Sequence, residues 1–192
     1  MKLILIIFYF LFLFQNFTKA DDIRDFEIEG MSIGDSLLNF LSKNEIENLR
    51  RNYVQGKDYY VVGIDDKLST YQTTDVYIKT GDTNYTIRTL GGMIFYDNLD
   101  NCLKKKSEIS KDLSFLFPNI KVEEMKGQHH FDPSGESKMY QSIFVLNELE
   151  DHVRIDCVTW SEKIKKEKKF TNYLAVIAMT HEINEWIRGG YN

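Results

Sequence analysis

The spacing of apolar and polar residues changes along the chain and divides it into helical and strand-like segments. Residues 26–28 form a short strand candidate. Cap signals at Asp35-Ser36, and at Ser42 with Glu45, predict one broken helix or two short ones across residues 35–52. From residue 58 the period becomes two, which predicts antiparallel strands. These strands cover residues 59–64, 75–79, 85–90 and 93–96, and the Gly91-Gly92 pair predicts a bulge or bend.

A longer amphipathic helix is predicted for residues 98–117. Its apolar residues recur at helical spacing, and Pro118 ends it. Lys104 to Lys106 lie largely outside the apolar stripe of this helix. The stripe therefore predicts that one helix face packs on an apolar surface.

The second half of the chain repeats the alternation of strands and helix. The predicted strands cover residues near 120–123, then 138–147, 152–160 and 170–179. An irregular loop is expected from Gly127 to Ser137, and a solvated hairpin loop over the charged segment 161–169. Thr180 is predicted to cap a last helix over residues 181–188.

Strands followed by a helix thus occur twice, over residues 58–117 and 138–188. The fold class is α+β, an antiparallel sheet with helices packed on it. Two strand-strand-strand-helix units are compatible with an ancient duplication. No residue-level similarity between the halves supports one, and small α+β folds often alternate in this way.

The first twenty residues have the layout of a secretory signal peptide. Lys2 is followed by an apolar run to Phe14 and a polar stretch that ends Thr18-Lys19-Ala20. The run is shorter than the ~20 apolar residues that a spanning helix needs. We therefore predict cleavage after residue 20 and a single mature domain over residues 21–192. We also predict no membrane span after cleavage, and localisation in the periplasm or outside the cell. The residue after the cleavage point is Asp21 and not cysteine, so a soluble protein is expected rather than a lipoprotein.

The charge of the mature chain disfavours binding to nucleic acid. Removing residues 1–20 takes away two lysines and no acidic residue, which changes the formal charge from −5 to −7. Nucleic-acid affinity depends on Lys and Arg that neutralise phosphates, so no nucleic-acid partner is expected.

Two cysteines are placed to meet between the long helix and the sheet. Cys102 lies on the apolar stripe of the predicted helix 98–117, and Cys157 alternates in phase with Val153 and Ile155. In an exported chain with only two cysteines, a disulfide between them is the leading interpretation. Two buried, unpaired thiols are the alternative.

The segment His129-His130-Phe131-Asp132 is the most polar irregular stretch. Two imidazoles and a carboxylate could bind Zn²⁺ or Cu²⁺, with His152 or Glu136 as further ligands. No spaced ligand motif supports this, and Asp-Pro-Ser-Gly is a good type I turn. We therefore keep these histidines and Asp132 as candidate binding residues, and assign no metal and no cofactor.

Other chemical motifs are weaker. The segment from His181 to Glu185 resembles a helical H-E-x-x-H zinc motif, but its second histidine is replaced by Glu185. Acidic residues also favour the N-terminus of a helix through its dipole, which is the preferred interpretation. The sequence contains no S-x-x-K nucleophile motif and no P-loop or G-x-G-x-x-G phosphate loop. A basic run over residues 163–169 could dock on anionic lipid or polysaccharide.

Three sequence blocks resemble a group of small exported bacterial proteins from AT-rich genomes. The blocks are residues 28–38 (IEGMSIGDSLL), Ile94-Phe95-Tyr96 with residues 102–105, and Cys157 with Trp160. That group has no assigned activity, so the resemblance implies bacterial origin and export and transfers no catalytic residue. Residues 32–41 also resemble the opening helix of outer-membrane assembly and β-lactamase-inhibitor-like modules. That likeness implies helices placed on an antiparallel sheet.

Three functional classes remain. The preferred class is a non-catalytic binding or interaction protein of the bacterial periplasm, whose partner is an envelope protein or a small ligand. The alternative is a metal-dependent or hydrolytic envelope enzyme that uses His129, His130 and Asp132, with His152 as a further candidate. The third is an assembly or inhibitor module that recognises another protein through a sheet face, which an exposed aromatic patch would mark.

Overall fold

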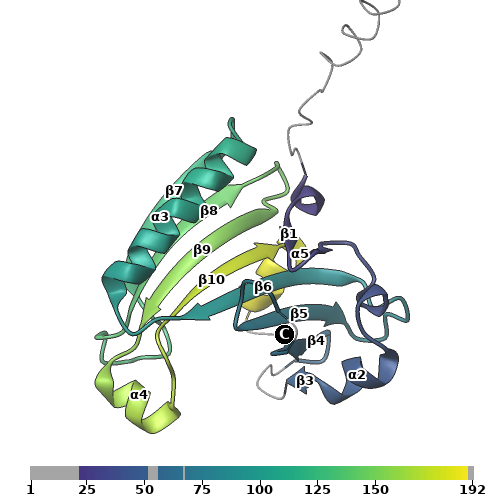
Figure 1. The fold of residues 1–192 in the computed structure, drawn as a ribbon, viewed down its shortest axis with the longest axis horizontal. Helices are drawn as coiled ribbons and strands as arrows, with labels where there is room; N and C mark the ends of the chain where they lie inside the picture. Colours follow the sequence, from purple (N-terminus) through teal and green to yellow (C-terminus); the bar gives the residue numbers. More distant parts are fainter. Residues whose placement is uncertain (1–21, 52–55, 67, 190–192) are drawn as a thin grey trace, which may run out of the picture.

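An eight-stranded antiparallel sheet organises the chain. The computed structural model describes residues 22–51, 56–66 and 68–189, and its strands follow the order β3-β4-β5-β6-β10-β9-β8-β7 (Figure 1). The bounds are β3 Arg50–Arg51, β4 Tyr59–Ile64, β5 Thr73–Lys79, β6 Ile87–Phe95, β7 Lys121–Gln128, β8 Lys138–Val145, β9 His152–Thr159 and β10 Tyr173–Met179. Helices pack against this sheet, so the predicted α+β class is confirmed. The predicted leader, residues 1–20, lies outside the described residues.

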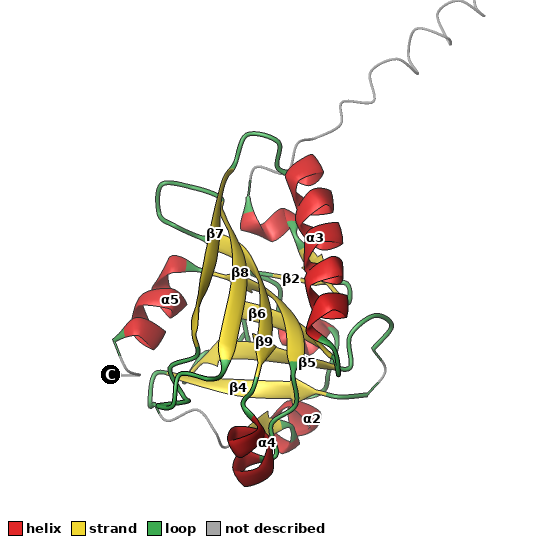
Figure 2. Cartoon of the chain, turned by 90° about the vertical axis from the view of Figure 1, so that its left-hand side faces the viewer, coloured by secondary structure: helices red, strands yellow, loops and turns green. Residues whose placement is uncertain are grey.

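The sheet consists of two four-stranded meanders that meet where β6 pairs with β10. A helix precedes each meander, α2 (Lys43–Asn48) before β3 and α3 (Leu99–Leu116) before β7. Both helices contribute residues to one hydrophobic core. The last helix, α5 (His181–Arg188), packs on the other face of the sheet (Figure 2). Helices α3 and α5, which follow β6 and β10, therefore lie on opposite faces, and the unit that recurs in space is a helix followed by a four-stranded meander.

The N-terminal segment covers the part of the core face that α3 leaves open. It contains the 3-10 helices η1 (Ile23–Asp25) and η2 (Leu37–Asn39) and a hairpin of β1 (Glu27–Ile28) and β2 (Met31–Ser32). Its apolar side chains join those of β4, β5 and β6 in the core. This face of the sheet is thereby closed to solvent along most of its length.

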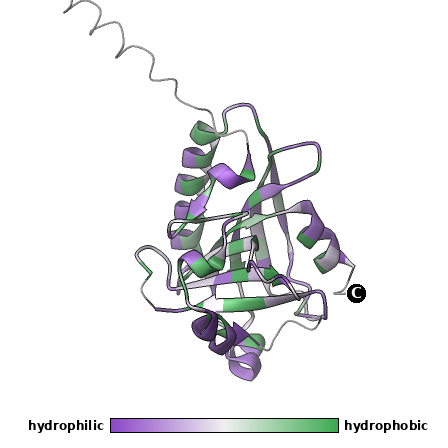
Figure 3. Cartoon of the chain, turned by 90° about the vertical axis from the view of Figure 1, so that its right-hand side faces the viewer, coloured by the Kyte–Doolittle hydropathy of each residue, from purple (hydrophilic) through white to green (hydrophobic). Residues whose placement is uncertain are grey.

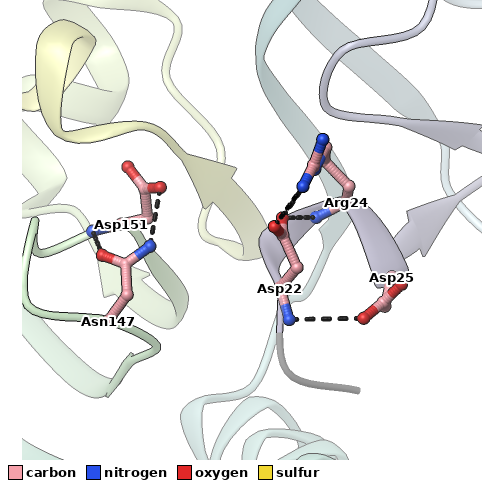
Figure 4. Close-up of polar contacts among 5 residues, drawn as sticks. All are labelled: Asp22, Arg24, Asp25, Asn147 and Asp151. Atoms are coloured by element: carbon pink, nitrogen blue, oxygen red, sulfur yellow. Dashed lines mark hydrogen bonds and ion pairs between the residues drawn. The ribbon is translucent and has the colours of Figure 1, made fainter. Parts of the chain in front are cut away.

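Side-chain caps fix the short N-terminal elements. The Asp22 carboxylate accepts a hydrogen bond from the Arg24 backbone N–H (2.9 Å), and Asp25 accepts one from the Asp22 N–H (3.3 Å) (Figure 4). The capping box predicted for Ser42 and Glu45 is confirmed at the start of α2. Because such short helices gain little from their own backbone bonds, these caps fix where they begin. The predicted helical region nevertheless ends before residue 50, since Arg50 and Arg51 pair with β4 as strand β3.

The predicted disulfide is confirmed. Cys102 on α3 and Cys157 on β9 are bonded, with their Cα atoms 6.0 Å apart, and both residues are buried. The prediction for Lys106 on the same helix was wrong. Its side chain is only 11% exposed, and its ammonium group donates to Glu124 (2.7 Å) and to Ser142. The apolar stripe of the helix did not predict the burial of Lys106, because the two acceptors lie on other elements, Glu124 on β7 and Ser142 on β8.

The Gly91-Gly92 pair does not bend its strand. Both glycines lie inside the continuous strand β6, which joins the two predicted strands 85–90 and 93–96. A Cβ atom on Gly92 would lie 2.5 Å from the ring of Tyr71, so the glycine provides the space that this ring occupies. The register shift in this region lies instead between Tyr77 and Ile78 of β5.

Two further segments differ from the sequence prediction. Residues 161–169, predicted to be a loop, contain α4 (Glu162–Lys168). Ser161 caps this helix, and Ile164 is buried beside Trp160, so a single apolar anchor holds an otherwise charged helix. Strand β7 extends well beyond the predicted 120–123, because it pairs with β8 along its whole length.

Candidate binding surface

Among the residues that the structure describes, the face of the sheet opposite α3 is covered only at its two ends. At one end, α5 packs Ile183 and Trp186 on residues of β4 and β10. At the other end, α4 and the loop of residues 129–137 pack around Trp160. Alternate residues of a strand point to the same face, so the strand register places the side chains between these ends on one surface. We call this surface the open face, and its residues are Met93, Phe95, Met125, Gln141, Ile143, Arg154, Asp156 and Ile177.

Apolar members of the open face remain in contact with solvent. Met125 is 53% exposed and Phe95 is 43% exposed, while Met93, Ile143 and Ile177 are half-buried. Methionine and aromatic residues are enriched in protein interfaces. Their collection on one uncovered sheet face is typical of a recognition surface.

A polar network crosses the middle of the open face. The buried Asp156 carboxylate accepts a hydrogen bond from Gln141 Nε2 (2.9 Å), and Arg154 Nε lies 3.0 Å from its second oxygen. The Arg154 side chain is 28% exposed. Within the described ranges, its two terminal nitrogens have no protein partner. Asp156 therefore holds the Nε atom of Arg154, while the two terminal nitrogens can donate hydrogen bonds to a bound partner.

Tyr173 borders this network on the neighbouring strand β10. Burial raises the pKa of its phenol far above the usual range, and the negative charge of Asp156 adds to the effect. The hydroxyl group thus stays protonated at physiological pH. It is a hydrogen-bond donor at the edge of the open face, and not a base.

Six rings form a continuous cluster beside the open face. The imidazole of His129 lies 4.3 Å from the ring of Trp160 and 4.8 Å from that of His130. Phe131 contacts both imidazoles, and on the other side Trp160 contacts Phe170 (4.8 Å) and Tyr173 (6.4 Å). We call this cluster the aromatic corner, and its residues are His129, His130, Phe131, Trp160, Phe170 and Tyr173. Burial lowers the pKa of His129 to about 4, so its ring is neutral at physiological pH.

Asp132 has a structural role in the same loop. Its carboxylate accepts hydrogen bonds from the backbone and hydroxyl groups of Ser134 (3.0 and 2.6 Å) and of Ser137 (3.0 and 2.6 Å). These bonds hold the pKa of Asp132 well below its usual range. Each oxygen already accepts two hydrogen bonds, so Asp132 closes the loop and is not presented to a ligand.

The structure does not bring His152 to the other candidate residues. His152 begins β9 and His129 contacts Trp160 just beyond its end, so a strand of about 23 Å separates them. The Nδ1 atom of His152 lies 3.0 Å from the carbonyl oxygen of Glu150, and burial lowers its pKa. His129, His130 and Asp132 therefore share a loop that His152 does not reach. Across residues 22–51, 56–66 and 68–189, no group of three His, Cys, Asp or Glu side chains is placed to hold a metal ion.

The start of α5 is capped by a residue that the sequence did not suggest. Thr180 makes no side-chain cap bond; instead Asp151, from the turn before β9, accepts the His181 backbone N–H (2.7 Å). The side chain of Asn147 in turn donates to Asp151 (2.9 Å) (Figure 4). Glu182 accepts hydrogen bonds from Tyr59 and from Lys79 (2.8 Å), so this carboxylate is an ion-pair partner and not part of a zinc motif.

Sequence reasoning missed the charged centre of the open face. Arg154 and Asp156 alternate with Ile155 and Cys157 in the strand 152–160, so their phase already placed them on the opposite face. That alternation was the available signal. The partner Gln141 lies on another strand, and only the β8–β9 register brings it there.

No family model, curated protein or solved structure matches this chain. Among the helices that the structure describes, none is long and apolar enough to cross a membrane. The geometry of its surfaces is therefore the basis for a functional proposal.

Proposed function

We propose that this chain is an exported, non-catalytic binding protein of the bacterial envelope that recognises a partner protein through the open face. The observation that supports this most is the combination of exposed Met125 and Phe95 with a central arginine whose terminal nitrogens have no partner in the described part of the chain. The leader peptide favours export. The disulfide between Cys102 and Cys157 is compatible with an oxidising compartment.

The chemistry of the open face defines the partner. Arg154 presents guanidinium donors that suit a carboxylate, and Arg and aromatic residues are frequent hot spots of protein interfaces. The apolar side chains on either side suit aliphatic or aromatic residues. We therefore expect a protein surface or segment that carries an acidic residue flanked by apolar ones.

Site-specific photocrosslinking tests the proposal. A photoreactive amino acid at position 93 or 143 should trap one envelope protein, whereas the same group at position 104, on α3 at the other face, should not. The affinity of the purified mature chain for the trapped protein is then measured. Because a central interface arginine typically contributes about 2 kcal/mol, Arg154→Ala should weaken binding roughly thirtyfold.

Matched variants separate recognition from folding. Arg24→Ala changes an exposed arginine away from the open face and should leave the affinity unchanged. Phe95→Ser should weaken binding and leave the ion pair of Arg154 and Asp156 intact. This variant still tests the proposal if Arg154→Ala fails to fold. Equal affinity of all three variants, or equal trapping at positions 93 and 104, would refute recognition through the open face.

A further inference from the structure

We propose that the aromatic corner and α4 together dock on an anionic membrane surface. This goes beyond protein recognition and uses a different surface. Two phenylalanine rings of the corner are exposed, Phe131 by 59% and Phe170 by 39%, while the central Trp160 is only 6% exposed. Trp160 thus anchors the cluster from inside, and its neighbours present apolar rings outward.

Helix α4 places basic residues beside these rings. It begins two residues after Trp160 and ends two residues before Phe170, so both of its ends are attached to the aromatic corner. Its seven residues span about 10 Å, which is close to the Debye length of about 8 Å at physiological ionic strength. The lysines in and next to α4 therefore act on the same region of space as the exposed rings.

The charge of this segment is opposite to that of the mature chain. Five lysines and two glutamates lie between Ser161 and Phe170, a formal charge of +3 in a mature chain of −7. The lysines are Lys163, Lys165, Lys166, Lys168 and Lys169. Only Lys165 has an ion-pair partner, Glu162, among the residues that the structure describes. An anionic surface attracts this corner and repels the rest of the chain, which fixes one orientation.

The loop of the histidines is attached to α4. The Ser137 hydroxyl accepts a hydrogen bond from the Ser161 backbone N–H (2.9 Å), and Asp132 holds Ser137 in turn. The loop and the helix are thereby held in one arrangement. Figure 1 shows α4 projecting beyond the ends of β9 and β10. In Figure 3 the hydrophilic helix nearest the viewer at the lower end is α2, and α4 lies behind it. A projecting corner of this kind can reach a flat surface without hindrance from the sheet.

The physical basis is that of peripheral membrane proteins. Aromatic rings bind at the boundary between headgroups and acyl chains, and lysine side chains bury their methylene stems while the ammonium group stays at the phosphates. Each lysine near an anionic bilayer increases binding about fivefold. The exposed phenylalanines add an apolar contribution that salt does not remove.

Vesicle binding of the mature chain tests this inference. The partition coefficient is measured by co-sedimentation with vesicles of phosphatidylglycerol and phosphatidylcholine, and with vesicles of phosphatidylcholine alone. We expect at least tenfold stronger binding to the anionic vesicles, decreasing with added salt. The double substitution Lys163→Gln with Lys166→Gln should reduce binding roughly twenty-five-fold, and Phe131→Ser should reduce it severalfold at all salt concentrations.

Controls with the same chemical changes lie on α3. Lys104→Gln with Lys111→Gln removes two exposed lysines, and Phe115→Ser removes a ring that is 88% exposed, so neither should change vesicle binding. Equal binding to both kinds of vesicle, or equal losses in corner and control variants, would overturn the proposal. Binding to a soluble acidic polysaccharide without binding to anionic vesicles would overturn it as well.

Discussion

The disulfide between Cys102 and Cys157 yields a stability prediction with a magnitude. The bond joins residues 55 positions apart. The loop-entropy model gives about 4 kcal/mol for a loop of that length. For the 172 residues that the predicted cleavage would leave, each kcal/mol shifts the midpoint of thermal unfolding by about 2–4 °C, so loss of the bond should lower it by roughly 8–16 °C.

Reduction of the wild-type protein measures the cross-link alone. Both sulfur atoms remain in the protein after reduction and only move apart to van der Waals distance, so neither buried side chain is shortened. Calorimetry of the mature chain with and without a phosphine reductant compares the two states. The single variants Cys102→Ala and Cys157→Ala should lose the same cross-link energy, plus a smaller packing term from the missing sulfur.

Two outcomes would refute this reasoning. One is a reduced protein that unfolds within about 2 °C of the oxidised one, because the cross-link would then add nothing to the stability of the folded state. The other is the titration of two thiols in denatured, non-reduced protein. Agreement between reduction and either single variant, to within a few degrees, would support the entropic account.

Further predictions concern buried charge, pH and backbone packing. Glu124→Gln should cost more stability, about 2 kcal/mol, than Lys106→Met, about 1 kcal/mol, because the lysine is 11% exposed and the glutamate 62%; chemical denaturation measures both. Burial lowers the pKa of His129 to about 4 from the ordinary 6.5. Below pH 6.5 the unfolded chain therefore binds a proton at this residue while the folded chain does not. The protein is most stable above pH 6.5 in this respect and loses stability as the pH falls towards 4. In His129→Phe the denaturation midpoint should depend less on pH across that window, and an unchanged slope would contradict this. Gly92→Ala should destabilise by about 2–3 kcal/mol, because its Cβ would meet a tyrosine ring at 2.5 Å, whereas Gly127→Ala, with no atom within 4 Å of its Cβ, should change stability by less than about 0.5 kcal/mol.

Features that depend on local periodicity were predictable from the sequence. Strand β4 coincides with the predicted residues 59–64, and α5 with residues 181–188. The Ser42 capping box and the cysteine pair were also predicted, because each rests on spacing within one element or on the face of one strand. The helical segment 161–169 was not, since its single buried residue, Ile164, gives too weak a pattern among so many charges.

Features of the candidate site depend on contacts between distant residues. Asp156 is satisfied by Gln141 from another strand, and α5 is capped by Asp151 from a turn 30 residues earlier. His152 has the residue type expected of a site member, but a whole strand separates it from His129. Neither the residue types nor the local pattern of apolar and polar residues specifies how far apart these residues lie in the folded chain.

By itself, the sequence determined the α+β class, the alternation of most strands and helices, and the positions of its two cysteines on apolar faces, because these follow from spacing within single elements. Only the tertiary structure decided which face of the sheet stays uncovered, since that depends on α3 and α5 packing on opposite sides. It also decided that Lys106 is buried and that the histidine loop meets Trp160. Both arrangements depend on packing between residues far apart in the chain, which the local sequence pattern does not specify.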